Sequence, residues 1–136
     1  LYYHFEALTK QGLIEPREVI KEEHRPDKQV FAITDKGREQ LSVKIYELFE
    51  KKDKISELII GLMFIRFVEI SRVIEILEKK LGRLYKKQDQ LKDIYSQIPV
   101  EEEMRDMIDF ANDYLTDTVS KDIQWMEKLI KNLKNS

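Results

Sequence analysis

A regular apolar repeat between residues 70 and 98 restricts the fold of this chain more than any other feature. Apolar side chains recur there at spacings that alternate between four and three residues. The members of the repeat are Ile70, Ile74, Leu77, Leu81, Leu84, Gln88, Leu91, Tyr95 and Ile98. Sustained over about four heptads, this seam predicts a long helix that needs a partner helix. Pro99 predicts its end, because the residue before a proline is disfavoured in the α region.

The seam indicates a contact with a second copy of the chain. Gln88 is its one polar member, and an amide at such a position sets register or pairing at some cost in stability. We expect dimerisation through Ile74, Leu77, Leu81, Leu84, Gln88, Leu91 and Tyr95.

Two further helical segments flank the seam. The run from Leu58 to Val68 is apolar but short and contains Arg66. Because a bilayer span needs about 20 apolar residues, this run predicts a buried core helix and no membrane segment. A last helix is expected from Glu101, where three glutamates suit the positive end of the helix dipole. Its apolar positions are Met104, Ile108, Ala111, Leu115, Val119, Ile123, Met126, Ile130 and Leu133. This stripe drifts around the helix, which favours packing both within the chain and across a second subunit.

The composition agrees with a mostly helical protein. There are only 4 Gly and 3 Pro, with 42% hydrophobic and 37% charged residues. With 0 Cys, disulfides and cysteine-based zinc sites are excluded, and a cytoplasmic location is favoured. The formal net charge of −2 does not by itself indicate nucleic-acid binding. The chain starts at Leu1 rather than Met, so we expect its true beginning to be missing.

The first third has a different pattern. Phe5, Leu8, Leu13 and Ile14 are expected on one face of a helix that Gly12 stops. Two β-prone runs follow, Glu18–Lys21 and Gln29–Ile33, separated by a charged loop.

A new helix is expected after these two strands. Thr34 is positioned to cap it, Asp35 suits its first turn, and it should continue through Phe49. The order helix, two strands, helix is that of a winged helix-turn-helix whose front is missing. In that fold a recognition helix enters the major groove and the wing touches the DNA backbone or minor groove.

The sequence contains no motif that indicates a catalytic site. His4 and His24 are the only histidines, and neither has metal-ligand spacing to another. No phosphate-binding glycine loop or nucleophile motif occurs, so we expect no enzyme activity, no metal and no cofactor. Tyr2 and Tyr3 cannot both face one core, so either one contacts DNA or both are half-buried packing residues.

Three segments resemble the PadR family of bacterial transcription regulators: LYYHFEALTKQGLIEP, RPDKQVFAIT and TDKGREQL. The helical remainder is similar to the longer PadR subfamily, which ends in a Trp-containing helix, here Ile123–Leu133. By position, Tyr2 matches the family's recognition-helix tyrosine, and Arg25 and Lys28 lie at its wing tip. Thr34, Gly37 and Arg38 match the start of the helix after the wing. The resemblance implies a homodimer held by the C-terminal helices, with one DNA-binding domain per subunit and regulation by a small molecule or cellular cue.

The expected fold is therefore mostly α: a partial winged helix-turn-helix with a two-stranded wing over residues 1–53, then a helical dimerisation and effector domain over residues 54–136. The expected function is a transcription regulator, a repressor, acting as a homodimer on a palindromic double-stranded DNA operator. The candidate DNA-binding residues are Tyr2, Tyr3, His4, Lys21, His24, Arg25 and Lys28. Trp125 and Met126 are candidates for an effector pocket. The alternative is a helical protein-interaction module without direct DNA binding.

Overall fold

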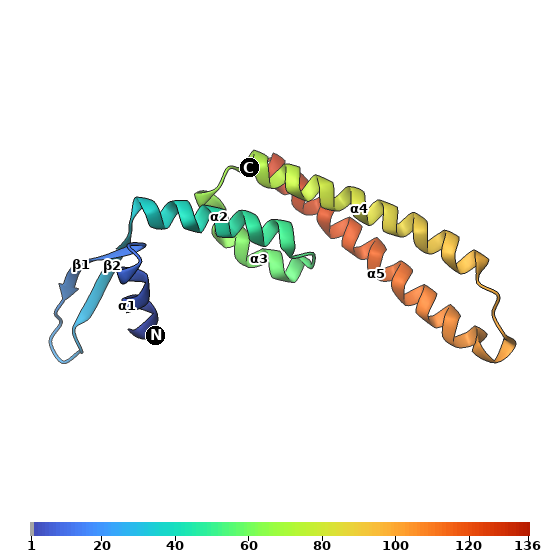
Figure 1. Ribbon diagram of the computed structural model, residues 1–136, viewed down its shortest axis with the longest axis horizontal. Helices are drawn as coiled ribbons and strands as arrows, with labels where there is room; N and C mark the ends of the chain where they lie inside the picture. The colour runs from blue at the N-terminus through green and yellow to red at the C-terminus, as the bar shows by residue number, and fades with distance from the viewer. Residues whose placement is uncertain (1) are drawn as a thin grey trace. The chain divides into compact units, whose positions relative to one another are not determined.

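The computed structural model describes residues 2–136, and their side chains from His4 onward. Its elements are α1 (Tyr2–Lys10), β1 (Ile14–Ile20), β2 (Lys28–Ile33), α2 (Asp35–Lys51), α3 (Ile55–Met63), the short 3₁₀ helix η1 (Ile65–Phe67), α4 (Ile70–Gln97) and α5 (Glu102–Lys134) (Figure 1). The predicted fold class, mostly α with a two-stranded antiparallel sheet after a helix, is confirmed.

The chain forms two compact units, Leu1–Glu47 and Leu48–Ser136. Their division falls inside α2, whereas the division predicted at residue 53 coincides with the break between α2 and α3. The functional roles assigned to the two predicted domains stay predictions.

The turn after α1 follows from a single glycine. Gly12 has a φ of 76°, which L-residues with a side chain rarely adopt. Its amide donates to the carbonyl of Thr9, and the amide of Leu13 donates to the carbonyl of Leu8 at 3.0 Å. These two bonds form a Schellman motif, which satisfies carbonyls at the helix end. The expected helix stop is confirmed.

The expectation that Leu13 and Ile14 share the helix face is wrong. The helix ends at Lys10, and Ile14 is already the first residue of β1, opposite Ile33. The left-handed turn at Gly12 changes the chain direction before either residue, so helical spacing no longer applies to them.

The hairpin is longer at its start than the sequence indicated. Strands β1 and β2 pair antiparallel from Ile14 opposite Ile33 to Ile20 opposite Lys28, with an irregularity between Pro16 and Glu18. A proline has no amide to donate to a neighbouring strand, so it is disfavoured inside a strand. The irregularity accommodates Pro16 and lets the strand begin before it.

The expected cap at the start of α2 is confirmed. The amide of Gly37 donates to Oγ1 of Thr34 at 3.0 Å, and the same hydroxyl donates to the carbonyl of Gly12 at 2.6 Å. Nζ of Lys36 donates to the carbonyl of Gln11 at 2.9 Å. The cap therefore also ties the turn after α1 to the first turn of α2.

The core of the second unit lies between α4 and α5, which run antiparallel beside each other (Figure 1). The wholly or nearly buried apolar side chains of this unit are Phe49, Leu58, Val73, Leu77, Val119, Ile123, Met126 and Ile130. Each fully buried side chain of this size contributes about 1.5–3 kcal/mol relative to its exposed state. The predicted α5 stripe is thus confirmed from Val119 to Ile130, whereas Met104 is exposed.

The run from Leu58 to Val68 is not the buried helix that its composition predicted. It is broken into α3 and η1, and only Leu58 and Gly61 of α3 are buried. Ile60 and Met63 point to solvent, because the chain covers only one face of this largely apolar helix. Among the described residues, no helix is both long enough and apolar enough to span a bilayer.

Candidate nucleic-acid interface and effector cavity

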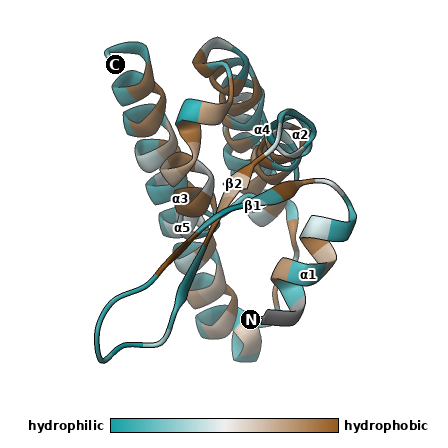
Figure 2. Ribbon diagram, turned by 90° about the vertical axis from the view of Figure 1, so that its left-hand side faces the viewer, coloured by the Kyte–Doolittle hydropathy of each residue, from teal (hydrophilic) through white to brown (hydrophobic). Residues whose placement is uncertain are grey.

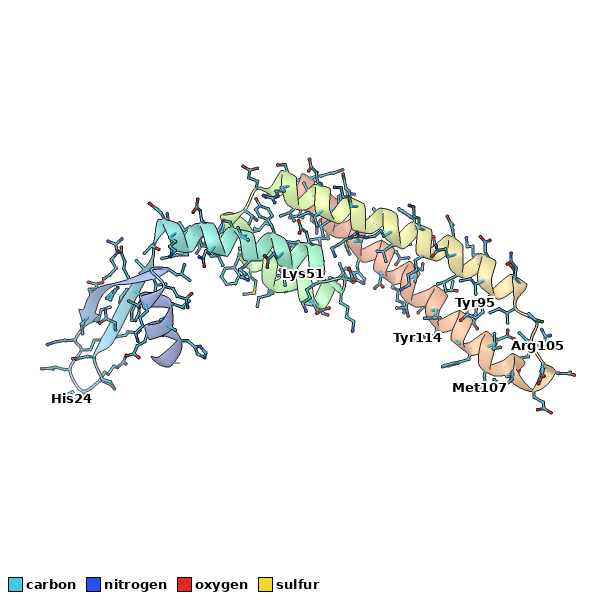
Figure 3. All side chains as sticks on the ribbon, in the orientation of Figure 1. His24, Lys51, Tyr95, Arg105, Met107 and Tyr114 are labelled. Carbon is cyan, nitrogen blue, oxygen red and sulfur yellow. The ribbon has the colours of Figure 1, made fainter. Side chains whose placement is uncertain are left out.

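The loop that joins β1 to β2 places the candidate wing residues at the end of the hairpin. His24 lies at its tip (Figure 3), with a φ of 64°, in a turn closed by the amide of Arg25 donating to the carbonyl of Glu22 at 3.3 Å. Lys21 directly follows β1, and Lys28 is the first residue of β2. All four candidate side chains are exposed, and Figure 2 shows this loop as hydrophilic.

The loop is balanced in charge rather than basic. Its cations Lys21, Arg25 and Lys28 are matched by three carboxylates, Glu22, Glu23 and Asp27. Nη1 of Arg25 lies 3.4 Å from Oε2 of Glu22. Both side chains are mostly exposed, and such surface pairs contribute about 0–1 kcal/mol. Breaking the ion pair between Arg25 and Glu22 therefore costs little free energy.

The candidate residues of α1 are only partly described. The side chain of His4 is exposed. The side chains of Tyr2 and Tyr3 lie outside the described part of the structure, so their expected contacts with DNA stay predictions.

The predicted seam of α4 packs largely within its own chain. Leu77 is wholly buried. The other six candidates are half-buried: Ile74, Leu81, Leu84, Gln88, Leu91 and Tyr95. The first partner of the seam is therefore α5 of the same chain, and a contact of these residues with a second copy stays a prediction.

The two candidate effector residues point to different places. Trp125 is 56% exposed, and Nζ of Lys128 lies 4.9 Å from the centre of its ring. Met126 is buried and lines a cavity on the other side of α5. Neighbouring helix positions differ by about 100°, which separates the two side chains. Nothing in the described structure brings Trp125 into that cavity.

The cavity holds about 420 Å³ and lies between the α2–α3 connection, α4 and α5. Four cations line it, Lys54, Lys80, Arg83 and Lys87, together with apolar Leu84. Sequence reasoning missed these cations. The signal was the spacing of Lys80, Arg83 and Lys87, which places three positive side chains on one side of the helix.

Lys80 is buried although lysine side chains usually reach solvent. Its side chain is 3% exposed, and Nζ donates to the carbonyl of Lys52 at 2.7 Å and to Oδ1 of Asp53 at 2.9 Å. The hydrogen bond from Lys80 holds the pKa of Asp53 below its usual value, helped by the positive charges of Lys80, Arg83 and Lys87. This interaction links α4 to the end of α2.

A further polar contact, between Tyr85 and Glu127, joins α4 to α5. The hydroxyl of Tyr85 donates a hydrogen bond to the Glu127 carboxylate, and this bond raises the pKa of the Tyr85 hydroxyl.

Within the part of the chain that the structure describes, no cluster of metal-ligating side chains occurs.

Solved structures with a similar arrangement include PadR of Bacillus subtilis in complex with operator DNA. It is 15% identical over 97% of this chain and 76% of that chain, with a TM-score of 0.48. The protein smu.1604c of Streptococcus mutans UA159 is 18% identical over 99% of this chain and 75% of that chain, with a TM-score of 0.32. No family model and no curated protein matches the sequence.

Proposed function

We propose that this chain is a non-enzymatic, PadR-type transcription regulator that binds double-stranded DNA in the bacterial cytoplasm. The observation that carries the proposal is the unit formed by α1, the β1–β2 hairpin and the start of α2. Its order is that of a recognition helix followed by a wing. The three sequence segments that resemble the PadR family cover the same elements.

The hairpin loop supplies the electrostatic part of DNA binding in this proposal. Lys21 and Lys28 have no ion-pair partner among the described residues, and Arg25 has only a weak one. Cations on phosphates hold a protein in register but carry no sequence information. Sequence would be read by α1, from which Tyr2, Tyr3 and His4 are the candidates.

The regulator acts as a homodimer in this proposal, and the described surface offers an apolar face for it. On α5 the face consists of Met104, Met107, Phe110 and Tyr114, and Figure 3 shows Met107 and Tyr114 on the side of α5 away from α4. Isolated soluble chains rarely leave such a contiguous apolar surface uncovered. A two-fold dimer would place two DNA-binding units on a palindromic operator with half-sites about 10 bp or a multiple apart.

The half-buried side chains of Gln88, Leu91 and Tyr95 belong to the same α4–α5 pair as this apolar face. We propose that they complete the contact, so that two α4–α5 pairs form a four-helix arrangement. Repression is the mode proposed, because a dimer that occupies an operator excludes other proteins from that DNA.

Selection of bound duplexes from a random DNA pool, carried out with the full-length protein, tests the proposal. A DNA-binding regulator enriches a two-fold symmetric sequence whose affinity falls steeply with salt. A pool that remains random at low salt would remove DNA binding from the function.

A second candidate, a helical interaction module, is favoured by one observation. The face formed by Ile59, Ile60 and Met63 of α3, with Phe64 directly after the helix, is exposed and apolar, while the wing carries no excess of positive charge. Under this alternative the same DNA selection enriches nothing, although the chain still self-associates.

A further inference from the structure

The cavity of about 420 Å³ in the second unit has the size of a small-molecule site. Its walls combine apolar groups, Leu84 of α4 and Met126 of α5, with positively charged side chains. Met126 is only 2% exposed, so the apolar end is set into the core rather than on the surface.

The positive charge of the cavity is not fully neutralised by the protein. Asp53 is bound to Lys80, which leaves Lys54, Arg83 and Lys87 facing one further carboxylate, Asp122. None of these three cations lies within ion-pair distance of a carboxylate among the described residues. A partly enclosed site with excess charge of one sign concentrates ions of the opposite sign.

Arg83 and Lys87 lie one helical turn apart on α4, so that both side chains border the cavity. A guanidinium binds a carboxylate or phosphate with two parallel hydrogen bonds, and a nearby ammonium adds a third. Leu84 is the neighbour of Arg83 in sequence and faces the same cavity. Charged and apolar contacts are therefore available to one molecule at the same time.

We propose that this cavity binds a small amphipathic organic anion. Its anionic group contacts Arg83 and Lys87, with Lys54 at the rim, and its apolar body packs against Leu84 and Met126. Lys80 is a positioning residue, because its ammonium is used by Lys52 and Asp53 and it holds the connection after α2 in place. A regulatory effect of the anion rests on the proposed DNA-binding function, whereas its binding does not.

Methionine methyl signals provide the test, with octanoate as the probe. The chain has 4 methionines, of which Met126 is buried at the cavity and Met63, Met104 and Met107 are exposed elsewhere. In the ¹³C-methyl-Met-labelled protein, octanoate should shift the Met126 signal saturably. The neutral alcohol 1-octanol and inorganic phosphate at the same concentrations should shift it far less.

Charge-neutralising variants locate the anionic contact. Arg83→Gln combined with Lys87→Gln should weaken octanoate binding about tenfold, which is the loss of a charge-assisted contact. Lys86→Gln combined with Lys92→Gln removes the same charge from α4 outside the cavity and should change the affinity by less than about twofold. Thermal unfolding of both variants checks that they fold.

Four results would overturn the proposal. They are an unchanged Met126 signal with octanoate, an equal response to 1-octanol, an equal response to phosphate, and undiminished binding by the Arg83 and Lys87 variant. Because no DNA is present, these outcomes are independent of whether the protein binds an operator. Release of a selected operator by octanoate, measured separately, tests the regulatory role.

Discussion

At the scale of single residues, Gly37 and Gly82 differ sharply in the space available for a side chain. A Cβ on Gly37 would lie 2.0 Å from the carbonyl oxygen of Leu13, where the cap of α2 meets the turn after α1. A Cβ on Gly82, in the exposed part of α4, would meet nothing within 4 Å. The first glycine is required by close backbone approach and the second is not.

Gly37→Ala should therefore destabilise the first unit by more than about 2 kcal/mol, because backbone must move to admit the methyl group. The matched change Gly82→Ala should stabilise the chain by about 0.5–1 kcal/mol through helix propensity. Denaturant unfolding followed by circular dichroism measures both. Equal stability of Gly37→Ala and the unmodified chain would contradict the close approach.

The interaction between Asp53 and Lys80 gives a prediction that depends on pH. Asp53→Asn should cost about 0.5–1 kcal/mol at pH 7, a small amount because the Asp53 side chain is 86% exposed and solvent screens it. The folded-state pKa of Asp53 is lowered, so its contribution is complete above the ordinary Asp pKa and is lost as the pH falls through the lowered value.

The difference in unfolding free energy between Asp53→Asn and the unmodified chain should accordingly shrink below about pH 4. Denaturant titrations at several pH values measure it. The exposed carboxylate variant Asp113→Asn serves as the control. A difference that stays constant down to pH 2 would exclude the ion pair as its source.

At the scale of elements, the hairpin is expected to act through charge. Arg25→Ala and Lys28→Ala should each weaken binding to all DNA sequences alike and reduce the slope of log affinity against log salt by about one unit. Lys79→Ala, an exposed change on α4, is the control. Fluorescence anisotropy over a range of salt concentrations gives the slopes, and an unchanged slope in the double variant would remove the wing from the mechanism.

The elements also show how far sequence reasoning extends. Gly12, Thr34 and Pro99 each act locally, through a left-handed turn, a side-chain cap and a steric restriction, and the boundaries they predicted agree with the structure. β1 begins at Ile14, before the predicted start at Glu18. Only pairing with β2 shows the irregularity that admits Pro16 into the strand.

At the scale of the whole molecule, the exposed apolar face of α5 is expected to hold two copies of the chain together. Met107→Glu combined with Phe110→Glu should convert the proposed dimer to a monomer while helicity is retained, because both side chains are mostly exposed, at 66% and 70%. Thr116→Glu with Gln124→Glu adds the same charge elsewhere on α5. Sedimentation velocity and circular dichroism distinguish the variants, and a Met107 and Phe110 variant that remains dimeric would place the contact on another surface.

Charged substitutions in the α4 seam should have a different effect. Leu81→Glu combined with Leu84→Glu should reduce helicity and stability as well as association, since both side chains are half-buried within the chain. Unfolding and sedimentation measured on one sample separate loss of fold from loss of dimer. A variant that keeps full stability and the dimer would show that the seam serves neither.

The sequence by itself determined the long helices, the hairpin, the stop at Gly12 and the cap at Thr34, because each depends on residues within a few positions of one another. The tertiary structure decided which face of each helix is covered. It placed α5 on the α4 seam, left most of α3 exposed and buried Lys80 beside Asp53. These outcomes depend on contacts between distant segments, and periodicity shows that a face is apolar without showing what covers it.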